Sequence, residues 1–206
     1  MKIKICGIKE LEEIEIINEF NLKYAGFIFS NSKRKISLAK GMILIRNLRK
    51  GILPVGVFVN EDISFVIKAI EICGLKIIQL HGNESLKYIR ELKRNLKSRS
   101  IKIWKVVHVK EELDILELKK YKIADGILFE TFKKGKFGGT GESFDWGLIK
   151  NIKLAQKKIL AGGINSENIK NAINISKADV IDVNSGVETN LIKDREKIKL
   201  LFENIN

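Results

Sequence analysis

The sequence predicts a single α/β domain in which eight parallel strands close into a barrel surrounded by eight helices, a (β/α)8 or TIM barrel. Short runs rich in Ile, Val, Leu and Phe recur along the whole chain, and a Lys- and Glu-rich amphipathic stretch follows each run. Such alternation indicates a parallel sheet. Polar and glycine residues stand where the expected strands end, the edge at which barrels carry their chemistry. An open, doubly wound sheet could hold as many strands, but eight similar units without extra elements favour closure.

Length and composition favour one domain over residues 1–206. The chain is near the short end for eight βα units, and 45% of its residues are apolar, enough for a large core. It has one proline and no run of Gly, Ser or acidic residues typical of a linker. The expected strands, mostly continuous apolar runs that suit a sheet covered on both faces, are residues 2–6, 24–29, 54–59, 76–81, 101–107, 124–130, 157–161 and 179–183.

Helical spacing is visible between these strands. Residues 11–17 carry apolar side chains every third position, with glutamates supplying the wet face. Residues 61–73 likewise place four apolar side chains on one stripe. Residues 165–168 open another helix, and Lys193 and Asp194 begin the last one.

The formal net charge of +13 raises the question of nucleic-acid binding. The Lys and Arg residues are scattered, however, and the few aromatic residues do not interleave with them as a base-stacking surface would. We expect a solvated basic surface and no nucleic-acid partner. A positive field would still raise the local concentration of an anionic substrate.

The cysteine count and the N-terminus favour a cytoplasmic protein. Cys6 and Cys73 are too few for a disulfide framework and fit no metal-binding spacing. The first residues form a charged, alternating strand rather than a signal peptide, and no segment reaches the roughly 20 apolar residues that span a bilayer. We therefore expect no membrane partner and no metal.

Two glycine turns at the last two strands indicate a phosphate site. Gly162-Gly163 and Ser185-Gly186 occupy the places where barrels commonly bind phosphate, and glycine lets backbone N–H groups approach an anion closely. Tight turns alone would also explain single glycines. The segment 138–141, which contains Gly139, is expected to close over the same group as a lid.

Four reactive side chains stand at strand ends. Cys6 ends the first strand beside a glycine, and a thiolate is a competent base if a nearby cation or dipole lowers its pKa. Glu130 ends the sixth strand, where a surface acid has no reason to follow an apolar run. His81 could equally be a satisfied core histidine, and Arg34 could be a solvated loop charge.

With these residues the chain resembles the phosphoribosylanthranilate isomerases of tryptophan biosynthesis along nearly its whole length. Each matching segment is weak alone, but all of them in order form a specific signal. The segments are Lys4–Ile8, Ala25–Phe29, Ser32–Arg34, Val55–Asn60, Gln79–Gly82, Phe137–Gly141, Phe144–Trp146, Leu160–Gly163 and Asp182–Glu188.

The resemblance implies residue roles. It implies that Cys6 is the general base and that Arg34 and Asp182 contact the substrate, Asp182 near the amine of the anthranilate ring. Gln79 and His81 are expected to bind the substrate too. The phosphate-binding backbone it implies is Gly139, Gly162, Gly163, Ser185 and Gly186.

The general acid that the resemblance implies is an aspartate, and this chain has Glu130 there. The extra methylene could misplace the carboxyl group by about 1 Å, a shift that can cost on the order of a hundredfold in rate. Asp125 cannot easily substitute, because it lies at the opposite end of the same strand.

The reaction implied is an Amadori rearrangement of an aminoaldose phosphate to an aminoketose phosphate. It needs an acid that holds its proton near pH 7, as a partly buried carboxyl group can, and a base that has lost its own. No step needs a redox centre or an electron sink, so no cofactor is expected. Both a monomer and a homodimer are compatible with the resemblance.

Three other functions fit the sequence less well. An indole-glycerol-phosphate synthase would carry its own lysine motif and a longer N-terminus, and neither is found. A ribulose-phosphate epimerase would need metal-binding His and Asp residues at strand ends, where His81 and Asp182 alone offer themselves. A nucleic-acid-binding protein would leave the ordered strand-end residues unexplained.

Overall fold

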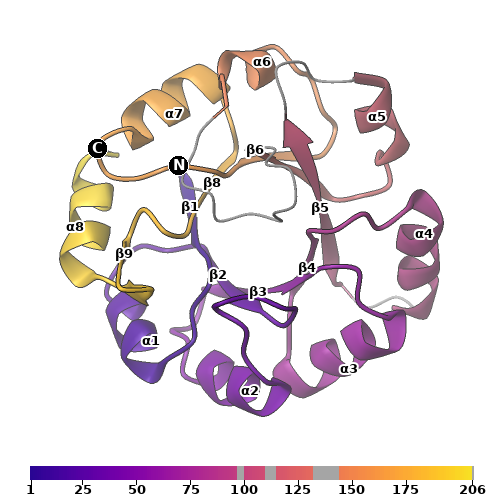
Figure 1. The fold of residues 1–206 in the computed structure, drawn as a ribbon, viewed down its shortest axis with the longest axis horizontal. Helices are drawn as coiled ribbons and strands as arrows, with labels where there is room; N and C mark the ends of the chain where they lie inside the picture. Colours follow the sequence, from indigo (N-terminus) through magenta and orange to yellow (C-terminus); the bar gives the residue numbers. More distant parts are fainter. Residues whose placement is uncertain (97–99, 110–114, 132–143, 206) are drawn as a thin grey trace.

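The eight strands form a closed parallel barrel in the order β1 to β8, which confirms the predicted fold (Figure 1). The computed structural model describes residues 1–96, 100–109, 115–131 and 144–205. Each observed strand overlaps its predicted run and differs at either end by two residues or fewer. The strands are β1 Lys2–Ile5, β2 Tyr24–Ile28, β3 Leu53–Phe58, β4 Ile77–Leu80, β5 Lys102–Val109, β6 Gly126–Thr131, β7 Lys157–Leu160 and β8 Val180–Val183.

The first and last strands close the barrel. Lys2 to Ile5 pair in register with Val180 to Val183, so that Lys4 stands opposite Asp182. The termini consequently lie near each other in the ribbon (Figure 1). This pairing brings Lys4 and Asp182, from the two ends of the sequence, together inside the barrel.

Eight helices surround the strands as a ring (Figure 1). Ser37, Ser85 and Asp194 begin three of them and accept hydrogen bonds from backbone N–H groups of the first turn, as N-caps do. The helices are α1 Leu11–Asn18, α2 Leu38–Arg46, α3 Ile63–Cys73, α4 Leu86–Asn95, α5 Ile115–Lys120, α6 Gly147–Lys150, α7 Ile169–Ser176 and α8 Arg195–Glu203.

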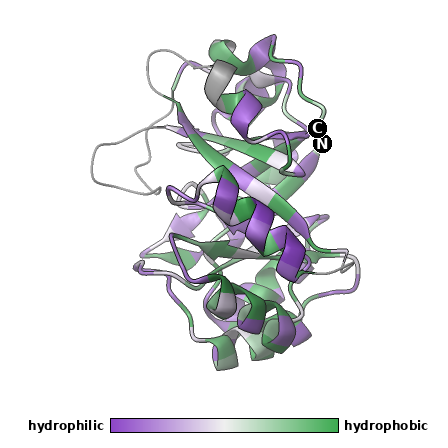
Figure 2. Ribbon diagram, turned by 90° about the vertical axis from the view of Figure 1, so that its right-hand side faces the viewer, coloured by the Kyte–Doolittle hydropathy of each residue, from purple (hydrophilic) through white to green (hydrophobic). Residues whose placement is uncertain are grey.

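The core has two parts. The larger cluster lies between the barrel and its helices, which alternate between apolar and polar colours while the strands are largely apolar (Figure 2). The smaller cluster fills the barrel itself and includes Tyr24, Ile77, Trp104 and Val180. Tyr24, Ile77 and Val180 are the first residues of their strands. The side chains at the opposite strand ends are therefore left to form a site.

One prediction about the fold was wrong, because eight units without extra elements were expected. A short antiparallel hairpin, β9 Glu188–Thr189 with β10 Ile192–Lys193, stands between β8 and α8. Its turn uses positive φ angles at Asn190 and Leu191, 52° and 65°. The hairpin places Glu188 and Lys193 side by side next to the barrel mouth.

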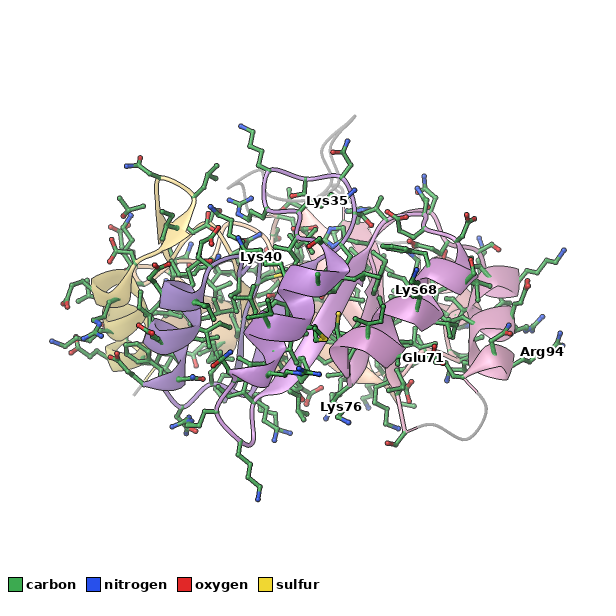
Figure 3. The ribbon with its side chains drawn as sticks, turned by 90° about the horizontal axis from the view of Figure 1, so that it is seen from below. Lys35, Lys40, Lys68, Glu71, Lys76 and Arg94 are labelled. Carbon is green, nitrogen blue, oxygen red and sulfur yellow. The ribbon has the colours of Figure 1, made fainter. Side chains whose placement is uncertain are left out.

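Basic side chains extend into solvent from both edges of the barrel, among them Lys35 and Lys76 (Figure 3). They are distributed over several elements, as expected from their scatter in the sequence. Not all lysines are solvated, however, because Lys4, Lys105 and Lys193 are buried. In the part of the chain that is described, no helix is long and apolar enough to cross a membrane.

Candidate active site

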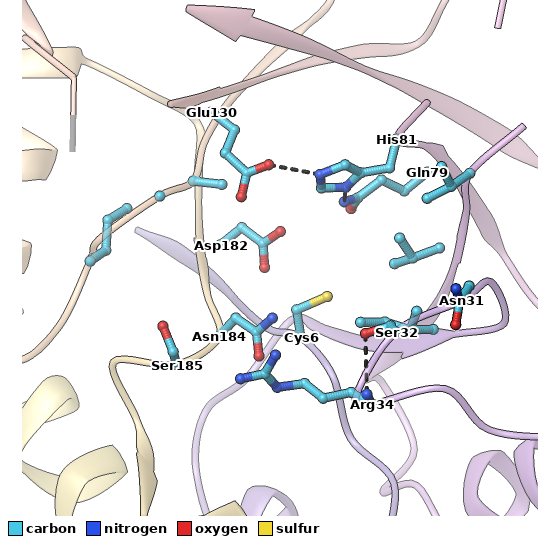
Figure 4. A pocket seen from close by; sticks show the side chains of 16 residues that line it. Cys6, Asn31, Ser32, Arg34, Gln79, His81, Glu130, Asp182, Asn184 and Ser185 are labelled. Carbon is cyan, nitrogen blue, oxygen red and sulfur yellow. Dashed lines mark hydrogen bonds and ion pairs between the residues drawn. The ribbon is translucent and has the colours of Figure 1, made fainter. Parts of the chain in front are cut away.

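A cavity of about 300 Å³ opens at the carboxyl ends of the strands (Figure 4). It brings together residues from seven separate segments of the sequence. Eight of the predicted site residues line it: Cys6, Arg34, Gln79, His81, Glu130, Gly162, Asp182 and Ser185. The predicted lid residue Gly139 lies outside the described residues.

The two glycine turns meet beside this cavity. Gly162 and Gly163 have φ angles of 94° and 63°, and a residue with a side chain would be strained at these angles. Gly186 pairs with Asn165 across the turn, and a Cβ atom on it would lie 1.9 Å from the carbonyl oxygen of Ile164. Gly163 and Gly186 thus shape the turns, while Gly162 and Ser185 face the cavity.

Cys6 follows β1 directly, and its sulfur points into the cavity (Figure 4). Its backbone N–H donates to the carbonyl oxygen of Val183, which fixes it against β8. Burial raises the pKa of the Cys6 thiol, and the neighbouring ammonium group of Lys4 opposes this rise only in part. The sequence supplied the candidate base; the structure adds the cation beside it.

Lys4 is fully buried inside the barrel, two residues before Cys6. Its Nζ donates to Oδ2 of Asp182 at 2.7 Å. Burial disfavours its charge, but Asp182 and Cys6 outweigh that effect and raise the pKa of Lys4. Oδ1 of Asp182 is buried without a hydrogen-bond partner among the described residues, and Asp182 is one of the residues that line the cavity.

Glu130 faces His81 across the cavity (Figure 4). Nε2 of His81 lies 2.7 Å from Oε2 of Glu130, and Nδ1 lies 3.1 Å from Nε2 of Gln79. Burial works to raise the pKa of Glu130, but the charge and hydrogen bond of His81 leave it below its ordinary value. The expectation that burial keeps this carboxyl group protonated therefore neglected His81.

Asp125 lies where the sequence placed it, before the first residue of β6. Its carboxylate accepts from the N–H of Ile103 and pairs with Lys102 at 3.2 Å, away from the cavity. It therefore cannot act as the acid in place of Glu130.

Arg34 is held by a buried ionic network. Its guanidinium donates twice to Glu188, at 2.8 and 2.5 Å, and this pairing raises the pKa of Arg34. Nζ of Lys193 donates to the same carboxylate at 2.6 Å and to Oδ1 of Asn184 at 3.0 Å. The backbone approaches closely here too, because a Cβ atom on Gly7 would lie 2.6 Å from Cδ of Arg34. Arg34 is thus a positioned side chain and not a loose loop charge.

Sequence reasoning missed three charged residues around the cavity, which are Lys4, Glu188 and Lys193. A signal for Lys4 was present, because side chains two positions apart on a strand share a face and Cys6 was already a candidate. Glu188 and Lys193 had no such signal, since their hairpin was not predicted. Among the described residues no group of three or more His, Cys, Asp or Glu side chains could hold a metal ion.

Comparisons with known proteins identify the family of this chain. Residues 3–204 match the family described as N-(5'-phosphoribosyl)anthranilate (PRA) isomerase. The N-(5'-phosphoribosyl)anthranilate isomerase of Clostridium kluyveri is 42% identical over 205 residues, which cover 100% of this chain and 98% of that protein.

Solved structures give the same result. The crystal structure of phosphoribosyl anthranilate isomerase from Thermotoga maritima superimposes with a TM-score of 0.88 at 32% identity, covering 100% of this chain and 98% of that one. A second such isomerase was solved with reduced 1-(o-carboxyphenylamino)-1-deoxyribulose 5-phosphate; it has a TM-score of 0.85 at 31% identity and the same coverage. With a full-length family match and these relatives, the chain belongs to the phosphoribosylanthranilate isomerase family.

Proposed function

We propose that this chain isomerises N-(5'-phosphoribosyl)anthranilate to 1-(2-carboxyphenylamino)-1-deoxyribulose 5-phosphate, the phosphoribosylanthranilate isomerase step of tryptophan biosynthesis, with Cys6 as base and Glu130 as acid. The observation that carries this assignment is the meeting of Cys6 and Glu130 in one cavity, from β1 and β6. The reaction needs one proton donated and one removed, and the two side chains approach a bound molecule from different walls of the barrel.

The chemistry proceeds by general acid–base catalysis. Glu130 donates a proton to the ribose ring oxygen as the ring opens to a Schiff base. Cys6, as thiolate, removes the proton from C2 and leaves an enolamine, which tautomerises to the ketone. Protons move between the substrate and these two side chains, and no electrons leave the substrate.

Glu130 must carry a proton for the first step. In the free protein the charge and hydrogen bond of His81 hold the pKa of Glu130 below its ordinary value. The substrate carries a phosphate and a carboxylate, and added negative charge raises the pKa of a carboxyl group. Substrate binding therefore raises the pKa of Glu130 and favours the protonated form that acts as the acid.

Further contacts hold the substrate. Asp182 accepts from the anthranilate amine, while Arg34 contacts the substrate from the loop after β2 and Gln79 contacts it from β4. The phosphate binds to backbone N–H groups of Gly162, Gly163, Ser185 and Gly186, joined by Gly139.

The direct test is turnover of phosphoribosylanthranilate by the purified chain, followed as loss of the substrate's fluorescence. Fluorescence should fall at a rate proportional to enzyme concentration, and this rate should be at least about a hundredfold lower with Cys6→Ser. An inactive wild-type protein that is folded by circular dichroism would contradict the proposal.

The molecule's partners and location follow from the same function. We propose that it works in the cytoplasm, where its two free thiols stay reduced, on a small anionic phosphosugar and without nucleic acid or membrane. The Thermotoga maritima isomerase is described as dimeric. Sedimentation equilibrium would decide between a monomer and a homodimer for this chain.

A further inference from the structure

We propose that Lys4 is a positioning residue whose ammonium group stabilises the thiolate of Cys6, and that Gly26 is the position that lets these two side chains meet. The inference rests on the proposed role of Cys6 as base. It assigns a function to Lys4, a buried cation that is neither one of the proposed substrate-binding residues nor one of the two acid–base residues.

The burial of Lys4 is the first observation. Its side chain is 0% exposed, and a buried ammonium group is costly unless it is paired. Asp182 supplies one partner at 2.7 Å. A lysine nitrogen has three protons to donate, so the contact with Asp182 leaves capacity for a second acceptor.

The surroundings of Gly26 indicate that Sγ of Cys6 is the second acceptor. A Cβ atom on Gly26 would lie 2.7 Å from Sγ of Cys6 and 3.0 Å from Nζ of Lys4. The two atoms therefore border the same position, which they can approach this closely because residue 26 has no side chain. Backbone N–H groups of Gly7 and Ile8 both donate to the carbonyl oxygen of Gly26, so β1 is held against β2 at this point.

The charges around Cys6 show why its thiolate needs the ammonium group of Lys4. Burial disfavours the thiolate, and the carboxylate of Asp182 disfavours it further, so a base at this position needs a cation. The charge of Lys4 opposes both effects, and Lys193 adds to it. Glu130 and His81 face the cavity from β6 and from the residue after β4, and Arg34 faces it from the loop after β2. Lys4 is thus the cation that pairs with Asp182 and borders the same space as Cys6.

The test measures thiolate formation directly, without turnover. The two cysteines are alkylated with iodoacetamide over a range of pH, and each is quantified by mass spectrometry. Cys73 is an internal control, because burial raises its pKa to about 11 and Asp182 and Lys4 are not among its neighbours. Its alkylation profile should be the same in every variant.

The variants are Lys4→Met, Asp182→Asn and the double variant. Loss of an opposite charge at this range is worth about one to three pKa units, so Lys4→Met should slow Cys6 alkylation at pH 8 by at least about tenfold. Asp182→Asn should speed it, and the double variant should lie between the two single variants. A Lys4→Met profile that coincides with the wild type would overturn the proposal.

Folding and function are separated by two further measurements. If Lys4→Met leaves Asp182 unpaired and unfolds the protein, the double variant removes both charges, and its profile is compared with that of Asp182→Asn. Alkylation of Cys6 as fast in the double variant as in Asp182→Asn would also overturn the proposal. If Cys6→Ser keeps its turnover, the proposed base is wrong, whereas the effect of Lys4 on the thiol remains measurable.

The activity of Lys4→Met gives an independent readout. Its kcat should fall at pH 7 and recover as the pH rises, because more of the thiol then ionises, while KM changes little. A merely structural role for Lys4 would lower kcat equally at every pH, and that result would contradict the proposal.

Discussion

Glu130 differs by one methylene from the aspartate that the family resemblance implies, and the structure gives the extra length a use. Its carboxylate reaches His81 at 2.7 Å. An aspartate would end about 1.5 Å short, the length of one carbon–carbon bond. The longer side chain therefore makes a contact that the shorter one would lose.

We expect Glu130→Asp to lower kcat, because the shorter side chain loses the contact with His81 that positions the carboxyl group. Glu130→Gln, which has no proton to transfer, should lower kcat by about the hundred- to ten-thousandfold that acid–base catalysis contributes. Steady-state kinetics of both variants provide the measurement, and KM should change little. If Glu130→Asp turned over faster than the wild type, the contact with His81 would hinder catalysis by Glu130 and would not support it.

Replacing Cys6 by serine should remove the base with almost no change in size. A hydroxyl ionises far above neutral pH, so kcat should fall by roughly a hundred- to ten-thousandfold while KM stays near the wild-type value. Cys73→Ser is the matched control, because Cys73 is buried against α2 and donates to the carbonyl oxygen of Leu38. Its turnover should be unchanged. A Cys6→Ser loss of less than about tenfold, well under that contribution, would remove Cys6 from the mechanism.

At the scale of elements, the turns after β7 and β8 act as one unit. Gly186→Ala should push its methyl group against the carbonyl oxygen of Ile164, which a Cβ atom would approach to 1.9 Å. The turns must separate, so we expect KM to rise more than kcat falls, together with a loss of stability of about 1–3 kcal/mol, typical of overpacking.

Gly51→Ala is the control for a generic glycine effect. Its φ of 101° strains an alanine, yet nothing lies within 4 Å of the added methyl group, and the residue is remote from the site. It should lower the midpoint of urea unfolding without changing KM. Equal KM values in Gly186→Ala and the wild type would show that these turns do not bind the phosphate.

The same scale shows what the sequence can predict. All eight strands were located, because continuous apolar runs bounded by polar residues leave little choice of element. The hairpin of Glu188 and Lys193 was missed for a physical reason. Its strands have two residues each, too few for periodicity, and its turn puts Leu191 at a positive φ that leucine rarely adopts.

The charges inside the site were harder to predict than its backbone. A lysine-rich composition suggests solvated lysines, yet Lys4 and Lys193 are buried among carboxylates. Their partners come from other strands or turns, and Asp182 is 178 positions from Lys4. Spacing along a strand shows which face a residue shares, but not which partner the barrel brings to it.

At the scale of the whole molecule, acid should destabilise the fold through its buried carboxylates. Arg34 and Lys193 outweigh burial and lower the pKa of Glu188 from an ordinary 4.5, and His81 does the same for Glu130. Groups whose folded pKa is depressed stabilise the protein above the unfolded value and lose that contribution as pH falls through the folded value. The free energy of unfolding should therefore decline below about pH 4.5.

Urea unfolding at a series of pH values between 7 and 3 measures this slope. Glu188→Gln should be less stable at pH 7, because two buried cations lose their counter-charge, and its stability should fall less steeply with acid. Identical slopes in the variant and the wild type would show that Glu188 does not carry this effect.

Closure of the barrel by β1 and β8 has a consequence for synthesis on the ribosome. Chains emerge at about 5 to 20 residues per second, so roughly 10 to 35 seconds separate the appearance of Lys4 from that of Asp182, 178 positions later. During that interval the nascent chain holds Cys6 and Lys4 on an open strand edge, without the carboxylate or the turn that completes the pocket. A chain truncated before Asp182 should have no activity at all, because the two ends of the message encode adjoining walls of one catalytic chamber.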